Sequence, residues 1–277
     1  MKKGISGWAF LDRDPDVCFS LAKQYGYDGV ELVLGTHGPV TYEATKEQMT
    51  ALREKAASYG LELYSLVCDQ CWDYSLTAND SAVRQKAEEM VRQQLKIAGW
   101  LGCDTILVLP GIVEGLAPGG EVVPYDVAYD RALDAISRLA VDAETYGVTI
   151  GLENVWNKFL LSPLEMRGFI DKVGSPRVKA YFDVGNVVVN GYPEHWIDIL
   201  GDRIAKVHFK DYVRANGTLD GFTDIGTGDV NYPAVLSALA KAGYDGFVTA
   251  EVFPEAEDPE RILRVSSEAV DKILGRA

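Results

Sequence analysis

Four residues that can bind a metal ion each stand at the end of a short apolar run. They are Glu153, Asp183, His208 and Glu251. A buried parallel strand is typically a short, nearly continuous apolar segment, and a polar group at its carboxyl end needs a partner or a function. The intervals between the four residues are each long enough for a helix and two connections, so successive strands would be neighbours. We therefore expect the four side chains to converge.

The types of donor point to a particular metal chemistry. Three carboxylates and one imidazole form a largely oxygen-donating set, which favours Mn²⁺, Mg²⁺ or Co²⁺ over a structural zinc ion held by thiolates. Such an ion, bound to a sugar carbonyl and the adjacent hydroxyl, stabilises the enediolate that forms when the neighbouring carbon loses its proton. Glu153 and Glu251 can then act as an acid/base pair, in which one removes the proton and the other returns it. Return to the same carbon from the opposite face gives an epimer, and return to the neighbouring carbon gives an isomer.

The composition limits the class of protein. The chain has 277 residues, 47% of them hydrophobic, which fits one α/β domain over residues 1–277. Its 27 basic and 41 acidic residues give a net charge of −14, which argues against nucleic acid or an acidic membrane surface as a partner. The N-terminus lacks the apolar core of a signal peptide, and no run of 18 apolar residues occurs, so we expect a cytoplasmic protein. Four cysteines are too few for a disulfide framework in this chain.

Helix and strand signals alternate along the whole chain. Helix starts are marked by Asp14-Pro15, Ser162-Pro163 and Asp258-Pro259, and helix ends by glycines at 26, 60, 102, 147, 174, 201 and 243. The expected strands lie near 4–8, 28–34, 61–68, 103–109, 148–153, 178–183, 204–209 and 246–252. The expected helices lie near 15–25, 45–59, 80–101, 126–146, 163–173, 194–200, 232–242 and 259–274. This alternation predicts a (β/α)8 TIM barrel. A doubly wound open sheet is the second choice, disfavoured because no G-x-G-x-x-G follows the first strand.

Five segments together resemble the xylose isomerase-like barrels, which include sugar and sugar-phosphate isomerases and epimerases. They are Leu152-Glu153-Asn154, Tyr181-Phe182-Asp183, Val207-His208-Phe209-Lys210-Asp211, Gly226-Thr227-Gly228 and Ala250-Glu251. The resemblance implies one divalent ion, with Mn²⁺ the first choice and Mg²⁺, Co²⁺ or Zn²⁺ as alternatives. It implies that Glu153, Asp183, His208 and Glu251 hold this ion, and that the two glutamates form the acid/base pair.

The resemblance also implies a substrate class and an assembly. Ketose 3-epimerases similar to L-xylulose-5-phosphate 3-epimerase and D-tagatose 3-epimerase are the nearest in pattern, so we expect a small ketose or ketose phosphate as the substrate. A homodimer or homotetramer is expected on the same grounds. One departure is Asn186, which stands where the tagatose-type enzymes have a substrate-binding histidine. This departure argues against a free ketose as the substrate and leaves the identity of the sugar open.

Further residues near the strand ends are candidates for binding the substrate. They are Trp8, His37, Trp156, Lys158, Asn186 and Lys210. The tryptophans could stack on the C–H faces of a sugar or pack over the barrel rim. The lysines could bind a phosphate or remain solvated. His37 stands in a loop that could reach the pocket, but solvent exposure is favoured there because loops lie mostly on the surface. Lys206 shares the inward parity of His208, and since a buried lysine requires a partner, we take Glu31 as its hypothetical partner.

Other functions are compatible with the same residues. A hydroxypyruvate-type isomerase or an inosose-type polyol dehydratase could use the same ion and carboxylates. A non-catalytic sugar-binding barrel would keep the site without moving protons. An apurinic-site endonuclease is disfavoured, because it requires a histidine-rich zinc cluster and a basic face, whereas this chain has three histidines and a net charge of −14.

Overall fold

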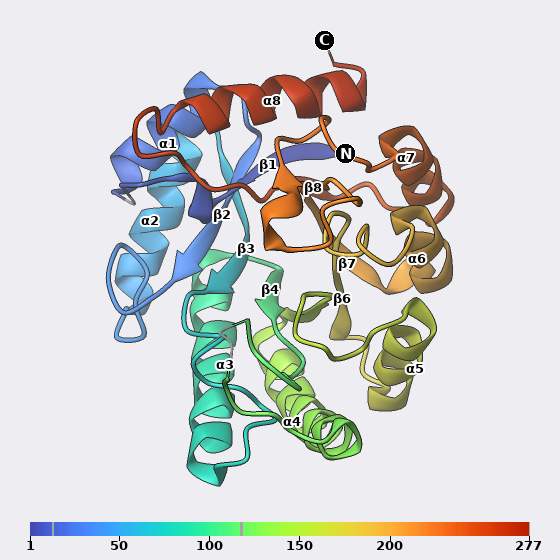
Figure 1. The fold of residues 1–277 in the computed structure, drawn as a ribbon. Coiled ribbons are helices and arrows are strands. Elements are labelled where there is room, and N and C mark those ends of the chain that lie inside the picture. Colours follow the sequence, from blue (N-terminus) through green and yellow to red (C-terminus); the bar gives the residue numbers. More distant parts are fainter. Residues whose placement is uncertain (13, 117–118, 277) are drawn as a thin grey trace.

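Parallel strands close into a barrel, as the alternating pattern predicts (Figure 1). The structure is a computed structural model that describes residues 1–12, 14–116 and 119–276. Within these residues the order of strands around the barrel is β1-β10-β7-β6-β5-β4-β3-β2. Their bounds are β1 Lys2–Ser6, β2 Gly29–Leu34, β3 Glu62–Cys68, β4 Thr105–Val108, β5 Thr149–Glu153, β6 Val178–Asp183, β7 Ile204–Phe209 and β10 Phe247–Ala250. Because β1 pairs with both β2 and β10, the sheet is closed and the open doubly wound alternative does not apply.

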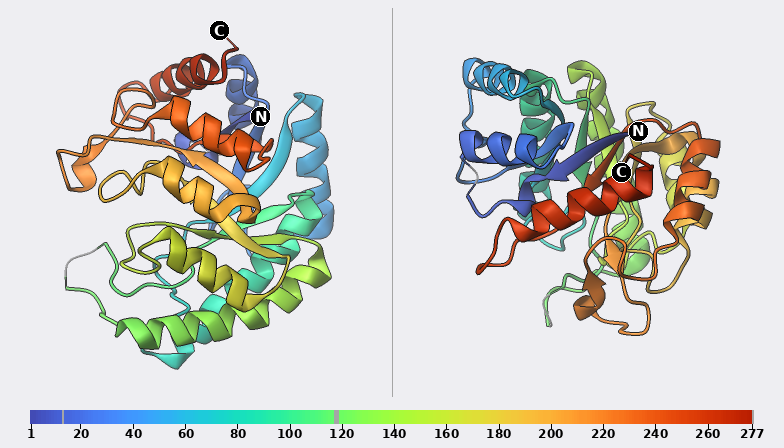
Figure 2. Two further views of the ribbon diagram at one scale, coloured as in Figure 1. Left: turned by 90° about the vertical axis from the view of Figure 1, so that its right-hand side faces the viewer. Right: turned by 90° about the horizontal axis from the view of Figure 1, so that it is seen from above.

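Helices cover the outside of the barrel and alternate with its strands (Figures 1 and 2). Their bounds are α1 Pro15–Gln24, α2 Lys46–Ser58, α3 Ser81–Leu101, α4 Tyr125–Tyr146, α5 Pro163–Val173, α6 Pro193–Leu200, α7 Tyr232–Lys241 and α8 Arg261–Leu274. In Figure 1, α3 and α4 lie side by side at the bottom and α8 runs along the top. This arrangement confirms the predicted (β/α)8 TIM barrel. None of the described helices is long and apolar enough to cross a membrane.

Most helix boundaries lie where the capping signals predict. The glycines expected to end helices have φ angles between 57° and 79°, which residues with a Cβ rarely adopt. Ser162 caps α5 by accepting a hydrogen bond from the backbone N–H of Glu165. The predicted start of the last helix is wrong, because α8 begins at Arg261 rather than at 259. Asp258 accepts the backbone N–H of Arg261 at 3.2 Å, so the residues between them form a turn before the helix.

An aromatic layer packs the N-terminal side of the barrel interior. Tyr64 of β3 stacks on Phe247 of β10, with ring centroids 3.7 Å apart and planes inclined by 7°. The Tyr64 hydroxyl forms a 2.8 Å hydrogen bond with Thr249. The ring fits because residue 4 is glycine, since a Cβ there would lie 2.0 Å from the Tyr64 hydroxyl oxygen. This filled layer leaves the carboxyl ends of the strands as the place for a site.

Candidate metal centre

Four side chains meet at the carboxyl ends of four adjacent strands. Glu153 is the last residue of β5, Asp183 the last of β6, His208 lies one residue before the end of β7, and Glu251 directly follows β10. Each offers one ligand atom, and these atoms lie within 4.8 Å of one another. Glu153, Asp183 and His208 are buried and Glu251 is partly exposed. The group could therefore bind one metal ion.

The polar atoms at the centre of this group fit a cation. Asp183 Oδ2 and His208 Nδ1 are buried and make no hydrogen bond among the described residues, although Lys210 Nζ forms a 3.5 Å ion pair with Asp183 Oδ2. Burying such atoms without a partner is unfavourable. His208 Nδ1 lies 3.4 Å from Glu251 Oε2 and 3.9 Å from Glu153 Oε1, so the oxygens surround the unpaired nitrogen. A divalent ion at this point would satisfy both orphaned atoms and offset the carboxylate charges.

A second group of residues orients His208. Its Nε2 lies 3.1 and 3.3 Å from the two carboxylate oxygens of Glu31 on β2. The Glu31 carboxylate also accepts hydrogen bonds from Ser65 Oγ, at 2.7 Å, and from the Tyr181 hydroxyl. All four residues are buried. Because a carboxylate on one ring nitrogen turns the other toward the metal, Glu31 presents His208 Nδ1 to the site.

The predicted pair of Lys206 with Glu31 is wrong. Lys206 Nζ lies 2.7 Å from Asp104 Oδ1 and 5.9 Å from the centre of the Tyr64 ring. Lys206 stands two residues before His208 on β7, so both point inward, but at different heights in the barrel. Lys206 therefore extends toward Asp104 at the N-terminal end, and the partner of Glu31 is His208.

The pKa values of the two glutamates are shifted in opposite directions. Burial and the nearby Glu251 carboxylate raise the pKa of Glu153 well above its usual value. Burial would also raise the pKa of Glu251, but Lys210 and His208 outweigh it and hold that pKa well below the usual range. Burial raises the pKa of Asp183 to about 6 despite the nearby Lys210. Without a metal ion, Glu153 therefore favours the protonated form and Glu251 the ionised form.

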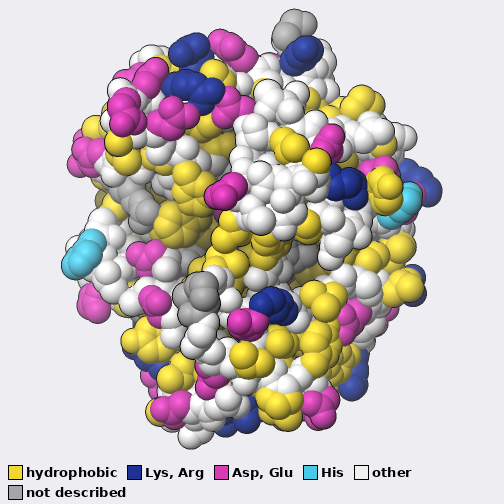
Figure 3. Space-filling model, viewed as in Figure 1, with side chains coloured by type: hydrophobic (Ala, Val, Ile, Leu, Met, Phe, Trp, Pro, Cys, Tyr) yellow, Lys and Arg dark blue, Asp and Glu magenta, His cyan; other side chains and the backbone are white. Residues whose placement is uncertain are grey.

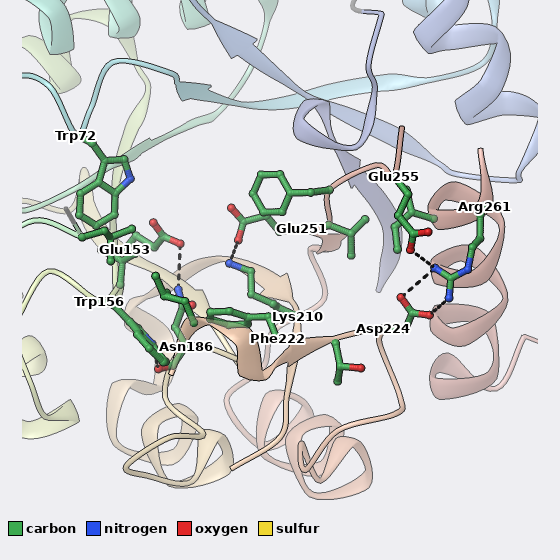
Figure 4. Close-up of a pocket in the computed structure, with 17 residues that line it drawn as sticks. Trp72, Glu153, Trp156, Asn186, Lys210, Phe222, Asp224, Glu251, Glu255 and Arg261 are labelled. Carbon is green, nitrogen blue, oxygen red and sulfur yellow. Dashed lines mark hydrogen bonds and ion pairs between the residues drawn. The ribbon is translucent and has the colours of Figure 1, made fainter. Parts of the chain in front are cut away.

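Lys210 supplies a positive charge to the cluster. Its Nζ lies 2.6 Å from Glu251 Oε2 and 3.5 Å from Asp183 Oδ2 (Figure 4). Burial alone would lower the pKa of Lys210, but these two carboxylates raise it above its ordinary value, so the side chain stays protonated. The ammonium also lies 5.0 Å from the centre of the Phe222 ring. Lys210 is thus a cation between the carboxylates and the open space above them.

Two asparagines hold the strand ends in place. Asn154, directly after β5, exchanges two hydrogen bonds with the backbone of Asp183, at 2.8 and 2.9 Å. The backbone N–H of Asn186 donates to Asp183 Oδ1 at 2.8 Å, and its side-chain amide donates to Asn154 O at 3.0 Å and to Glu153 Oε1 at 3.5 Å. These contacts fix both carboxylates against each other. The positioning role of Asn154 was not predicted from the sequence, although the residue adjoins Glu153.

A cavity of about 740 Å³ opens above the cluster. Figure 3 shows a hollow in the middle of the face, bordered mostly by hydrophobic side chains. Trp72, Trp156 and Phe222 line the inner part of the cavity beside Glu153, Asn186, Lys210 and Glu251 (Figure 4). Asp224, Glu255 and Arg261 line the other part, where the arginine pairs with both carboxylates. The cavity therefore combines aromatic walls with charged groups on its floor and at one side.

The remaining predicted substrate-binding residues lie elsewhere. Trp8 packs against the cluster that includes Val33 and Val67, and does not line the described cavity. His37 is exposed and does not line it either. Lys158 pairs with Glu114 and borders a neighbouring cavity of about 380 Å³ on the other side of Trp156. Of the predicted residues, Asn186, Trp156 and Lys210 lie in the main cavity.

The long segment after β7 is anchored by a carboxylate that the sequence did not single out for this role. Asp211 is buried and accepts the backbone N–H groups of Tyr212, Gly226, Gly228 and Val230 at 2.8 to 3.1 Å. The approach is so close that a Cβ at Gly228 would lie 2.4 Å from Asp211 Oδ1. The segment includes the short antiparallel pair of β8 (Asp211–Tyr212) and β9 (Phe222–Thr223). Asp211 thus places Phe222 and Asp224 at the cavity.

Sequence relatives of the chain include sugar epimerases. L-ribulose 3-epimerase of Methylomonas sp. is 27% identical over 247 residues, which cover 86% of this chain and 79% of the relative. Putative L-ribulose-5-phosphate 3-epimerase SgbU of Escherichia coli is 26% identical over 254 residues, which cover 86% of this chain and 84% of the relative. The two relatives thus carry names that differ in whether the ribulose is phosphorylated.

The fold is shared with solved structures at lower identity. D-psicose 3-epimerase from Clostridium cellulolyticum H10, solved with D-tagatose, superposes with a TM-score of 0.82 at 18% identity, over 99% of both chains. The sequence profile described as "Xylose isomerase-like TIM barrel" matches residues 19–273. The chain therefore belongs to the xylose isomerase-like TIM barrel family.

Proposed function

We propose that the protein is a divalent-metal-dependent isomerase-class enzyme that epimerises or isomerises a small ketose. The observation that carries the proposal is the convergence of Glu153, Asp183, His208 and Glu251 on one point at the floor of a cavity with aromatic walls. Relatives named as ribulose 3-epimerases support the reaction class. The four side chains would hold the ion, and the oxygen-rich donor set favours Mn²⁺. A bound ion would supply Lewis-acid polarisation of a sugar carbonyl.

Two glutamates on opposite sides of the cluster would move the proton. Glu153 follows β5 and Glu251 follows β10, with β6 and β7 between them, so a sugar bound over the cluster would have one carboxylate toward each face. In the metal-free protein, Lys210 and His208 hold the pKa of Glu251 low, and burial raises that of Glu153. Glu251 would remove the proton beside the carbonyl, and Glu153, in its protonated form, would return one from the other face.

Three neighbouring side chains would position the sugar. The Lys210 ammonium, 2.6 Å from Glu251 Oε2, can donate to the oxygen on which negative charge develops. The Asn186 amide, 3.5 Å from Glu153 Oε1, can bind an adjacent hydroxyl group. The Trp156 indole N–H donates to Asn186 O at 2.9 Å, which fixes its ring beside the cavity for stacking on a C–H face.

Proton exchange tests the proposal. The protein, stripped of Mn²⁺ and reloaded with diamagnetic Mg²⁺ in D₂O, is incubated with D-psicose, D-tagatose, D-fructose and L-ribulose and followed by proton NMR. We expect deuterium to enter beside the carbonyl of at least one sugar, and the labelled carbon distinguishes epimerisation from isomerisation. A product that has lost water relative to the sugar would instead indicate a dehydratase. If the metal is bound but no deuterium enters any sugar, the result would support a binding protein.

Glu251→Gln tests the assigned base. The substitution keeps an oxygen donor but removes the carboxylate that accepts the proton, so we expect kcat to fall at least 10²-fold. Glu257→Gln is the control, because Glu257 lies on the same connection but is exposed and does not line the cavity. Turnover by Glu251→Gln equal to that of the control would refute the role of Glu251.

A further inference from the structure

We propose that the site takes an uncharged ketose and discriminates against its phosphate ester, a proposal that rests on the function proposed above. It concerns the side of the cavity away from Trp72 and Trp156, where Asp224, Glu255 and Arg261 lie (Figure 4). We call these three residues the rim triad. The relatives include one protein named for a phosphorylated ribulose and one named for an unphosphorylated ribulose. Sequence similarity alone therefore does not distinguish between the two substrates.

The connection that would bind a phosphate in this fold is acidic. TIM barrels frequently bind phosphate with the loops after the seventh and eighth strands and a nearby helix N-terminus. Here the segment 251–260 between β10 and α8 has no lysine or arginine. It carries the acidic residues Glu251, Glu255, Glu257, Asp258 and Glu260. Because Glu260 directly precedes α8, negative charge already occupies the helix end that would attract an anion.

The cations at the cavity are already paired. Lys210 contacts Glu251 and Asp183, as described above. The Arg261 guanidinium contacts the Asp224 carboxylate through two nitrogens and lies 3.2 Å from Glu255 Oε1. These are the basic side chains among the described residues that line the cavity. A phosphate bound to either of them would lie beside a carboxylate that already contacts the same cation.

The net charge of the metal-bound site also disfavours a phosphate ester. The centre contributes the carboxylates of Glu153, Asp183 and Glu251, and the rim adds two more. With all five carboxylates ionised, two side-chain cations and one divalent ion leave about one negative charge. A phosphate ester with a charge near −2 at neutral pH would therefore be repelled, whereas a neutral sugar would not.

The surroundings of the rim triad suit a neutral molecule. Leu219, Val252, Phe253 and Ile262 also line the cavity. Phe253 is 61% exposed and Leu219 46% exposed, which leaves apolar surface available at the mouth. Hydroxyl groups can donate to the remaining lone pairs of the Asp224 and Glu255 carboxylates, while the C–H groups of the sugar contact these apolar side chains.

A matched pair of substrates tests the proposal. Deuterium exchange by the Mg²⁺-loaded protein is measured with L-ribulose and with L-ribulose 5-phosphate, and kcat/KM is compared. We expect the free sugar to be favoured at least tenfold. The double variant Asp224→Asn/Glu255→Gln frees Arg261 to bind phosphate, so we expect the ratio to move toward the ester at least fivefold. The control Asp220→Asn/Glu257→Gln removes equal charge from the same two connections at exposed positions and should leave the ratio unchanged.

The outcomes separate this proposal from the proposed function. Faster exchange with the phosphate ester would overturn the inference while supporting the enzyme function. A change of ratio in the control equal to that in the rim variant would show that overall charge rather than the rim triad discriminates. If neither sugar exchanges, titration calorimetry of both with the Mg²⁺-loaded protein decides the inference, because tighter binding of the ester would overturn it.

Discussion

Glu31 and His208 face each other across the barrel interior, and their contact determines what the imidazole can do. Because Nε2 lies 3.1 Å from the Glu31 carboxylate, Nδ1 is left for the metal. We expect Glu31→Gln to weaken metal binding about 10- to 100-fold, since the carboxylate that orients and polarises the ring is lost. The measurement is Mn²⁺ titration calorimetry of the purified variant.

Ser65→Ala is the matched control for Glu31→Gln. It removes the 2.7 Å hydrogen bond to Glu31 Oε2 but keeps the carboxylate and its contact with His208. We expect Ser65→Ala to lose less affinity for Mn²⁺ than Glu31→Gln. The activity of Glu31→Gln should recover partly at high Mn²⁺. An unchanged dissociation constant in Glu31→Gln would show that the carboxylate only fills space.

The sequence could predict which residues converge but not all of their partners. Glu153, Asp183, His208 and Glu251 could be proposed as a group because each ends an apolar run, and strand ends meet in a barrel. The alternation of side chains shows that Lys206 points inward but not at which height it lies, so its partner was assigned wrongly. Height depends on the stagger between strands, and β6 and β7 shift register between Ala180 and Tyr181.

At the scale of elements, the segment after β7 depends on one carboxylate. Asp211 accepts four backbone N–H groups, three of them from 226–230, which draws the far end of the segment back to the strand. We expect Asp211→Asn to lose at least one of these charge-assisted hydrogen bonds, each worth about 1.5–3 kcal/mol. KM should rise several-fold because Phe222 and Asp224 lose their support. Hydrogen exchange read by mass spectrometry should accelerate in residues 213–230.

Asp229→Asn provides the comparison within the same segment. Asp229 accepts one backbone N–H, from Arg214 at 2.8 Å, at an exposed position. Its loss should alter exchange less than the loss of Asp211. Equal exchange in both variants would contradict the anchoring role of Asp211.

Elements were more predictable than the paths between them. Glycines and caps mark helix ends locally, so the eight expected helices and barrel strands agree with the structure to within a few residues. The path of 210–231 depends on Asp211 meeting N–H groups up to 19 residues away in sequence, a contact that local propensity does not encode. The rim triad likewise joins the segment after β7 to the start of α8.

For the whole molecule, metal binding and folding are linked through protons. Burial and Glu251 raise the pKa of Glu153, and burial raises that of Asp183 to about 6. Burial would lower the pKa of His208, but Glu31 and Glu251 outweigh it and raise that pKa well above its usual value. Groups with raised folded-state pKa values bind more protons when folded, so their contribution to the stability of the metal-free protein falls as pH rises above about 4. A metal ion competes with protons for these ligands, so its affinity rises over the same range.

Thermal unfolding at several pH values measures this linkage. We expect the rise in Tm on adding Mg²⁺ or Mn²⁺ to be small at pH 5.5 and to grow through pH 6.5 to 7.5. At a ligand concentration of 100 times Kd, the stabilisation is about 2.7 kcal/mol. For a chain of this size that corresponds to a shift on the order of 5–10 °C. Asp183→Asn removes a ligand charge and should abolish most of the shift at every pH, whereas a shift in the parent protein that stays constant or shrinks with rising pH would show that the ion binds elsewhere.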